Sequence, residues 1–295
     1  MMRIFGTLFA GLVGLCFGSF LNVCLSRWPE RESVVEPRSH CRHCTHTLSW
    51  WENIPLLSWL ILRGRCRNCR AWIGWRYPLV ELAVGVLWAV QTWDVLPWIL
   101  DPYFLPIQTA LYAAPVFFSM LMIWLLIALA VLDAEHLWLP DWMTIPGILI
   151  GIVDTSLLGF LLIHQPHCDC IGVSGFAYAL HAILDSLFAA GLILLIRWVY
   201  WLVRKREGLG LGDVKLMALL AAWLGLKMAL LSFGLGVFLG ALVALILLAI
   251  PAARRESGSW SLTKLPLGTF LCIGGIVSSL WGESILNAYL HWAGF

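Results

Sequence analysis

Long stretches without any charged side chain are the feature that most constrains this chain. Residues 4–26, 102–132 and 228–253 are free of charge, and each is long enough for a transmembrane helix, which takes about 20 residues. Only 12% of the chain is charged and 61% is hydrophobic, whereas soluble domains have a charged share near one quarter. A transmembrane β-barrel would show alternating segments of roughly 10 residues instead. We therefore expect an all-α polytopic membrane protein.

The distribution of lysine and arginine predicts the orientation of these segments. Nine arginines lie within 27–76, and neither lysine nor arginine occurs from 77 to 196. Basic residues return within 204–215 and 251–265. Because positive residues mark the cytoplasmic side, we expect these three basic regions to face the cytoplasm. The stretch HQPHCDC at 164–170 is expected on the opposite side.

About eight transmembrane helices satisfy both the apolar pattern and the charge pattern. The expected spans are 4–26, 78–98, 105–132, 142–163, 174–203, 214–226, 229–250 and 266–290. The sixth is short and could tilt or fail to cross fully. The first is too long for the core of a signal peptide, and no A-x-A cleavage site follows it. With eight crossings, both termini lie outside the cytoplasm.

This pattern divides the chain into three parts. Residues 1–26 form a first transmembrane helix, and residues 27–76 form a small cytoplasmic domain between the first and second helices. Residues 77–295 form the remaining membrane domain.

The cytoplasmic segment carries two C-x2-C pairs. They are CRHC at 41–44 and CRNC at 66–69, and they supply the thiols of Cys41, Cys44, Cys66 and Cys69. Paired C-x2-C turns present four thiolates to one Zn²⁺ in tetrahedral geometry. Two disulfides or four idle thiols are the alternatives, but disulfides are rare in the reducing cytosol. We expect a structural zinc site, in which His43 or His46 could replace one thiolate.

The remaining cysteines carry different expectations. Cys16, Cys24 and Cys272 lie in apolar spans and are expected to serve as small packing residues. Cys168 and Cys170 lie on the outer side, where a disulfide is chemically allowed.

The stretch GLGLGDVK at 208–215 places an acid directly after alternating glycines at the edge of an apolar span. Gly210 and Gly212 allow the backbone to turn sharply or to approach another segment closely. Asp213 lies where the positive end of a helix favours its anionic form. Its simplest structural role is that of a helix N-cap.

A second acidic cluster lies at the same expected boundary. The sequence ALAVLDAEHLWLPDW at 128–142 provides Asp133, Glu135 and Asp141. Ionisable groups in or beside a membrane span are costly and indicate function by default. Asp141 after Pro140 also suits the start of the next helix. If Asp133 and Asp213 meet, one carboxyl group would hold a proton while the other activates water, as in an aspartic protease.

Several motifs resemble those of one family, the bacterial type IV prepilin peptidases, which are membrane aspartic proteases of the GxGD type. The motifs are GSFLNVCLSRWP (18–29), the two C-x2-C pairs, RYPLVEL (76–82), LDAEHLWLPD (132–141), GLGLGDVKLMALLAAWLG (208–225) and KLPLGTFLCIGG (264–275). The resemblance implies that Asp133 and Asp213 are the catalytic acids, with support from Gly210, Gly212 and Lys215 and from the boundary acids Glu135 and Asp141.

The chain also departs from the family pattern. The family often has an aspartate where Glu135 stands, and its last motif usually has Phe and Pro at the positions of Leu267 and Thr269. We expect that none of these departures touches the catalytic pair.

The resemblance implies a substrate class, a location and a second activity. The substrates are prepilins or the pseudopilins of type II secretion, cut between a basic leader and an apolar helix at the cytoplasmic face of the bacterial inner membrane. Members with the cysteine domain often N-methylate the new N-terminus with S-adenosylmethionine as the donor. No Gly-rich methyl-donor loop is visible, so the donor site is not assigned, although Glu81 is a weak candidate. No nucleic-acid partner is expected.

Two other classes of function remain open at this stage. A proton- or cation-coupled transporter could use the same acids as a relay, although transporters often contain inverted repeats and none is visible here. A non-catalytic assembly protein could use the zinc domain to bind a cytosolic partner. Such a protein would not need the acid motifs.

Overall fold

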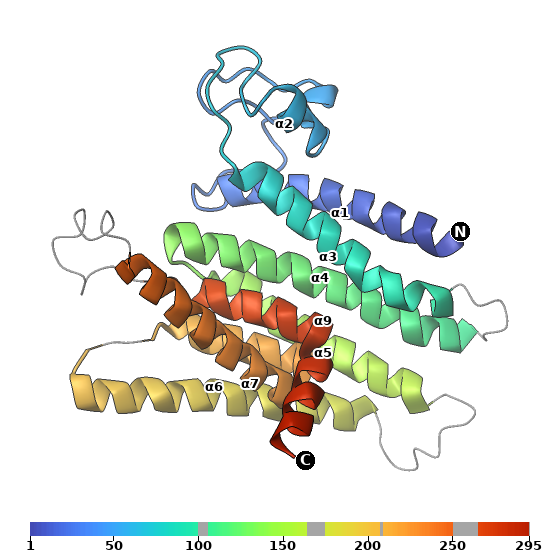
Figure 1. The fold of residues 1–295 in the computed structure, drawn as a ribbon, viewed down its shortest axis with the longest axis vertical. Coiled ribbons are helices and arrows are strands. Elements are labelled where there is room, and N and C mark those ends of the chain that lie inside the picture. Colours follow the sequence, from blue (N-terminus) through green and yellow to red (C-terminus); the bar gives the residue numbers. More distant parts are fainter. Residues whose placement is uncertain (100–105, 164–174, 207–208, 250–264, 295) are drawn as a thin grey trace. The chain divides into compact units, whose positions relative to one another are not determined.

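The structure is a computed structural model that describes residues 1–99, 106–163, 175–206, 209–249 and 265–294 (Figure 1). The long helices are α1 (Met2–Arg27), α3 (Arg76–Ile99), α4 (Pro106–His136), α5 (Asp141–Ile163), α6 (Gly175–Arg204), α7 (Leu211–Ala249) and α9 (Leu267–Ala293). In the described ranges, seven helices are long and apolar enough to cross a membrane. The expected helical polytopic architecture is therefore confirmed. The predictions for 164–170, including Cys168 and Cys170, and for the basic residues of 251–264 lie outside the described residues.

The expected sixth and seventh spans are two arms of α7. The arms meet at Gly225, whose φ of 74° and ψ of 165° are not helical. Asp185 of α6 accepts a hydrogen bond of 3.1 Å from the backbone N–H of Leu226, the first residue after the bend. A break in a membrane helix exposes backbone polar groups that must find partners within the protein, and Asp185 satisfies one of them.

One compact unit comprises Met1–Ala128. In it α1 packs along α3, and glycines let the two backbones approach closely. A Cβ atom at Gly18 would lie 2.7 Å from Cα of Glu81, and one at Gly14 would lie 2.9 Å from Cα of Gly85. Small residues at such crossings are typical of packed membrane helices. The cysteine segment extends from the adjoining ends of α1 and α3 (Figure 1).

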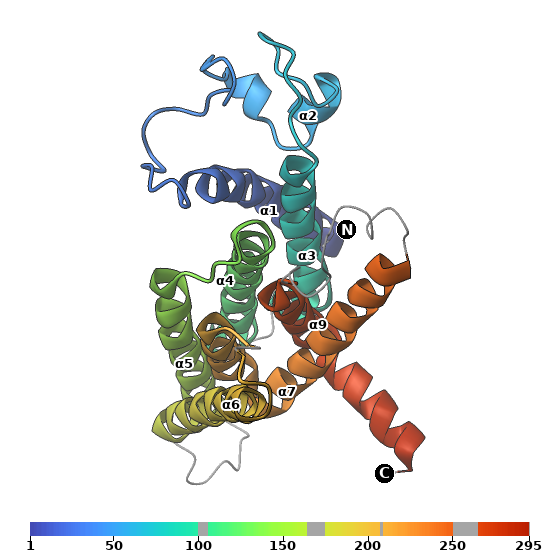
Figure 2. The ribbon, with the colours of Figure 1, turned by 90° about the vertical axis from the view of Figure 1, so that its left-hand side faces the viewer.

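The second compact unit comprises Leu129–Phe295. Helix α7 is its centre, because α5, α6 and α9 all pack against it (Figure 2). The contact with α9 is close, since a Cβ atom at Gly274 would lie 2.4 Å from the carbonyl oxygen of Ser232. The first arm of α7 is almost completely buried from Val214 to Ala222. The start of α9 packs against the second arm of α7, since a Cβ atom at Gly236 would lie 3.1 Å from Cα of Leu271.

Candidate functional site

The four cysteine sulfurs of the first unit form one compact group. Their Sγ atoms all lie within 4.8 Å of one another. The Cys41–Cys69 and Cys44–Cys66 sulfur distances are 3.7 Å and 3.9 Å. Four thiolates around one zinc ion with Zn–S bonds of about 2.3 Å would have sulfurs about 3.8 Å apart. The group is therefore a possible metal site, and its thiols are free rather than disulfide-bonded.

The two C-x2-C turns repeat one backbone geometry. The N–H of Cys41 donates to the carbonyl of His46, and the N–H of Cys66 donates to the carbonyl of Ala71, each at 2.9 Å. In both turns the residue after the second cysteine, Thr45 or Arg70, has a positive φ. This repetition holds each pair of thiols on one side of its turn, so the two turns can face each other.

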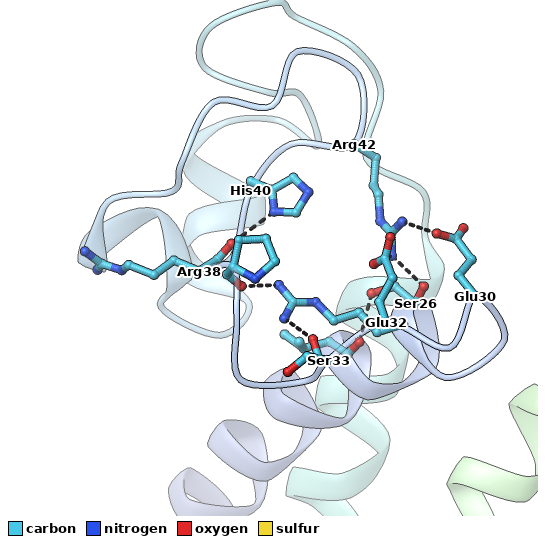
Figure 3. Close-up of polar contacts among 10 residues, drawn as sticks. Ser26, Glu30, Glu32, Ser33, Arg38, His40 and Arg42 are labelled. Atoms are coloured by element: carbon cyan, nitrogen blue, oxygen red, sulfur yellow. Dashed lines mark hydrogen bonds and ion pairs between the residues drawn. The ribbon is translucent and has the colours of Figure 1, made fainter.

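Polar contacts hold the cysteine segment to the end of α1. Arg42, which lies inside the first C-x2-C turn, donates to the carboxylate of Glu30 at 2.7 Å and to the carbonyl of Ser26 (Figure 3). The Arg42 guanidinium holds the pKa of Glu30 below its usual range. The backbone N–H of His46, together with the side-chain amide of Asn68, lowers the pKa of the Cys44 thiol to about 6. A thiol that ionises readily is suited to bind a metal ion.

Neither histidine considered as a replacement ligand is part of the sulfur group, which consists of the four cysteines. The His46 ring instead lies near Glu52, with Nε2 3.8 Å from Oε2.

In the second unit, Asp133 lies in the last turn of α4 and is only 6% exposed. Its Oδ2 accepts a hydrogen bond of 2.7 Å from the backbone N–H of Thr269 and lies 3.3 Å from the Thr269 hydroxyl oxygen. Thr269 belongs to the first turn of α9, where backbone N–H groups have no partner within the helix. The carboxyl group of Asp133 thus satisfies the N-terminus of another helix.

Asp213 lies in the first turn of α7 and is 9% exposed. Its Oδ2 accepts a hydrogen bond of 3.0 Å from the backbone N–H of Gly210. Asp213 is the third residue of α7, and Gly210 directly precedes the helix. The hydrogen bond therefore corresponds to one half of a capping box. The prediction that Asp213 is the N-cap residue is therefore wrong, because Gly210 occupies that position and Asp213 accepts its N–H with one oxygen.

Leu139 links the surroundings of the two acids. Its Cδ1 atom would lie 3.0 Å from a Cβ atom at either Gly212 or Gly268, and Oδ2 of Asp133 would lie 2.8 Å from a Cβ at Gly268. Asp213 directly follows Gly212, so both acids lie beside Leu139. The structure therefore brings Asp133 and Asp213 into one buried site, and glycine is required where the surrounding chain comes closest.

The other predicted site residues lie at the edge of this site. Lys215 and Asp141 form an ion pair between the first turns of α7 and α5, so Asp141 is engaged by a side chain in addition to starting its helix. Glu135 lies beside His136, with Oε2 3.9 Å from Nε2. The Lys215–Asp141 pair thus joins the start of α7, which carries Asp213, to the start of α5, whereas the Glu135–His136 pair joins two neighbouring residues of α4.

One expectation about the family departures is wrong. Thr269 does touch the expected catalytic pair, because its N–H donates directly to Asp133. The sequence gives no sign of this contact, since it joins residues 136 positions apart. Asp185 was also missed, although an acid inside an apolar span is itself a signal of an internal partner.

The fold and these two sites define a polytopic membrane protein with a buried pair of carboxyl groups and a four-cysteine module. The sequence model described as "Bacterial Peptidase A24 N-terminal domain" matches residues 12–95, and that of the "Type IV leader peptidase family" matches residues 120–245. The chain belongs to this type IV leader peptidase family.

Full-length relatives support this membership. Proteins named "Prepilin leader peptidase/N-methyltransferase" are 34% identical in Stutzerimonas stutzeri and 36% identical in Aeromonas hydrophila. The alignments cover 96% and 95% of this chain and 93% and 92% of the relatives. The protein of the same name in Pseudomonas aeruginosa is 33% identical over 96% of this chain. No solved structure matches.

Proposed function

We propose that this chain is a prepilin leader peptidase that also N-methylates the N-terminus it creates. The name shared by its full-length relatives supports both activities. The observation that carries the peptidase proposal is the meeting of two buried acids, Asp133 and Asp213, in one site of the second unit. The substrate is a prepilin or pseudopilin, and the location is the bacterial inner membrane, with the acid pair and the cysteine module on the cytoplasmic side.

The paired carboxyl groups supply the hydrolytic chemistry. Two carboxyl groups that share a site do not both ionise easily, so one keeps a proton while the other accepts one from water. The water oxygen attacks the carbonyl carbon of the scissile peptide bond. The protonated carboxyl group polarises the carbonyl oxygen, and the C–N bond then breaks as the leaving amine takes up a proton. Each carboxylate offers about four acceptor positions, so both retain capacity for water beside their helix-capping bonds.

The surrounding residues hold this pair in place. Gly210 supplies an N–H to Asp213, and Gly212 leaves room for Leu139. The Lys215–Asp141 ion pair fixes the beginning of α7 against that of α5, and Glu135 contributes to the polar rim beside it. The apolar helix of the substrate would lie among the membrane spans, while its basic leader stays in the cytosol.

The four cysteines would hold a structural zinc ion. The segment between α1 and α3 contains only the short helices η1 (Trp50–Asn53) and α2 (Leu57–Ile61). Such a segment has little apolar core, so metal binding would supply much of its folding free energy. The methyl donor would be S-adenosylmethionine, which carries an activated methyl group on a positively charged sulfur.

The decisive experiment mixes a purified prepilin with wild-type protein, Asp133→Asn or Asp213→Asn, with and without S-adenosylmethionine, and follows the products by mass spectrometry. Glu283→Gln is the matched control, because Glu283 is an acid of the same unit with 72% of its side chain exposed. Wild type and the control should remove the leader, and added donor should increase the product by one methyl mass. Neither aspartate variant should cleave.

Full cleavage by either aspartate variant would disprove the acid pair. Absence of cleavage by metal-loaded wild type with several prepilins, together with proton-coupled uptake in proteoliposomes, would favour a transporter instead.

A further inference from the structure

A cavity of the first unit lies where the cysteine segment meets the ends of α1 and α3. It has a volume of about 260 Å³ and is lined by side chains that include Asn22, Glu52, Trp59, Trp72, Tyr77 and Glu81. This volume is near the lower end of the range of small-molecule sites, which begins at about 300 Å³. The cavity combines aromatic walls with buried polar groups, which is typical of a ligand site rather than of a packing defect.

Two polar atoms of this cavity are acceptors without donors, although the other oxygen of Glu52 accepts a hydrogen bond of 2.8 Å from the N–H of Ser49. Oδ1 of Asn22 and Oε1 of Glu52 are buried and have no hydrogen-bond partner in the described structure. The two residues are 3% and 5% exposed. Leaving a buried acceptor unpaired costs about 1–3 kcal/mol. Such acceptors indicate that a donor or a cation belongs here.

Glu81 adds a buried carboxyl group to the same cavity. It is 8% exposed, and its carboxyl group accepts a hydrogen bond of 2.8 Å from the neutral backbone N–H of Leu56. The lining also contains three arginines, each of which has a partner. Arg67 lies over the Trp51 ring, 5.0 Å from its centroid. Arg27 donates to the carbonyls of Ser33 and Pro37, and Arg42 is held by Glu30.

The aromatic wall favours the same kind of ligand. The Trp59 and Trp72 rings pack edge to face, with centroids 5.9 Å apart, and Trp59 is oriented by a hydrogen bond from Nε1 to the carbonyl of Ile73. Indole faces attract cations such as ammonium groups, and a positively charged sulfonium is attracted in the same way. A nucleoside base can also stack on an indole ring.

We propose that this cavity binds the methyl donor, S-adenosylmethionine, with Asn22, Glu52 and Glu81 facing its cationic end. The inference rests on the proposed N-methyltransferase function and assigns that function a site. S-adenosylmethionine carries a sulfonium, an ammonium group and an adenine base. The unpaired acceptors, the buried acid and the indoles suit these three groups. The residues present therefore fit the donor.

The test is binding of S-adenosylmethionine to the purified, metal-loaded full chain in detergent, measured by isothermal titration calorimetry. S-Adenosylhomocysteine is the comparison ligand, because it lacks the methyl group and the positive charge on sulfur. Glu81→Gln should weaken S-adenosylmethionine binding roughly tenfold, as expected for the loss of one charge-assisted contact. It should weaken S-adenosylhomocysteine binding less. Asp94→Asn is the matched control, since this acid of α3 is 84% exposed in its side chain, and it should bind like wild type.

A second measurement does not depend on any variant. Ultraviolet cross-linking of radiolabelled S-adenosylmethionine to wild type, followed by peptide mapping, should place the label within residues 19–81, which contain the cavity lining. Label found only within 129–295, or equal binding by wild type and Glu81→Gln, would overturn the inference. Leader cleavage by the same preparation reports on the peptidase separately. Cleavage without donor binding therefore rejects this site while leaving the proposed peptidase intact.

Discussion

The backbone N–H of Thr269 donates a hydrogen bond of 2.7 Å to Oδ2 of Asp133, across 136 residues of sequence. The first turn of α9 thereby directs an otherwise unpaired N–H at the acid, and the positive end of the helix favours a negative charge at this place. The Thr269 hydroxyl lies closer to the carbonyl of Ala130, at 3.0 Å, than to Asp133. The main chain of Thr269 is therefore its principal link to Asp133.

Thr269→Pro and Thr269→Val separate these two contacts. Proline removes the N–H and is tolerated in the first turn of a helix, whereas valine keeps the N–H and removes the hydroxyl. Proline is the usual family residue at this position, so Thr269→Pro should keep leader cleavage and lower kcat/KM less than tenfold, although it loses a hydrogen bond to a charged group that contributes about 1.5–3 kcal/mol. Thr269→Val, which keeps the N–H, should cleave like wild type. A loss of tenfold or more in Thr269→Pro would show that Asp133 of this chain depends on the Thr269 N–H, and a larger loss in Thr269→Val would show that the hydroxyl orients Asp133.

Gly268→Ala should impair cleavage by crowding the acid. The added Cβ would lie 2.8 Å from Oδ2 of Asp133 and 3.0 Å from Cδ1 of Leu139. Overpacking of this kind costs about 1–3 kcal/mol, and here the strain would move a reacting group. Gly191→Ala is the matched control, because a Cβ atom at Gly191 meets nothing within 4 Å. The measurement is the rate of leader cleavage by each variant. Equal rates for Gly268→Ala and Gly191→Ala would show that the contact with Gly268 is not tight in solution.

The parts of this molecule that the sequence predicts are those with a short-range signal. Charge-free runs predict the transmembrane helices because a helix needs about 20 apolar residues in succession to cross a bilayer. The C-x2-C spacing predicted a sulfur group because two such turns have a fixed local geometry. Asp133 and Asp213 were identifiable because an acid at the edge of an apolar span is unusual.

The parts that could not be predicted depend on tertiary contacts. Thr269 could be recognised only as a departure from the family pattern, and only the packing of α9 brings it to Asp133. The cavity beside Glu81 arises from segments between residues 19 and 81 that meet in three dimensions. The spans at 214–226 and 229–250 could be expected, but not that they form two arms of α7 bent at Gly225.

Loss of the metal should unfold the cysteine segment. Purified protein should contain about one zinc ion per chain, because four thiolates complete its tetrahedral coordination. Cys66→Ser should lose the metal, whereas Cys16→Ser, which changes an exposed cysteine of α1, should keep it. The arginine-rich region 27–76 offers trypsin many sites once it unfolds. Metal analysis and limited trypsin digestion test this, and a Cys66→Ser protein that resists trypsin as wild type does would contradict a structural role for the metal.

The bend in α7 should depend on both Gly225 and Asp185. The backbone of Gly225, with φ of 74° and ψ of 165°, occupies a region that costs other residues of order 1–3 kcal/mol. Gly225→Ala should therefore lower the unfolding midpoint in detergent. Asp185→Ala should lower it as well, since it removes the acceptor of the Leu226 N–H, while Asp185→Asn retains an acceptor oxygen and should stay closer to wild type.

Gly234→Ala is the control. It lies in the same helix with nothing within 4 Å of the added Cβ, and it should be neutral or stabilising by about 0.5–1 kcal/mol. Scanning fluorimetry of the four variants would reveal the difference. If Gly225→Ala and Gly234→Ala had the same unfolding midpoint, the two arms would form one continuous helix. The position of Asp185 inside the membrane would then not be explained by a bend in α7.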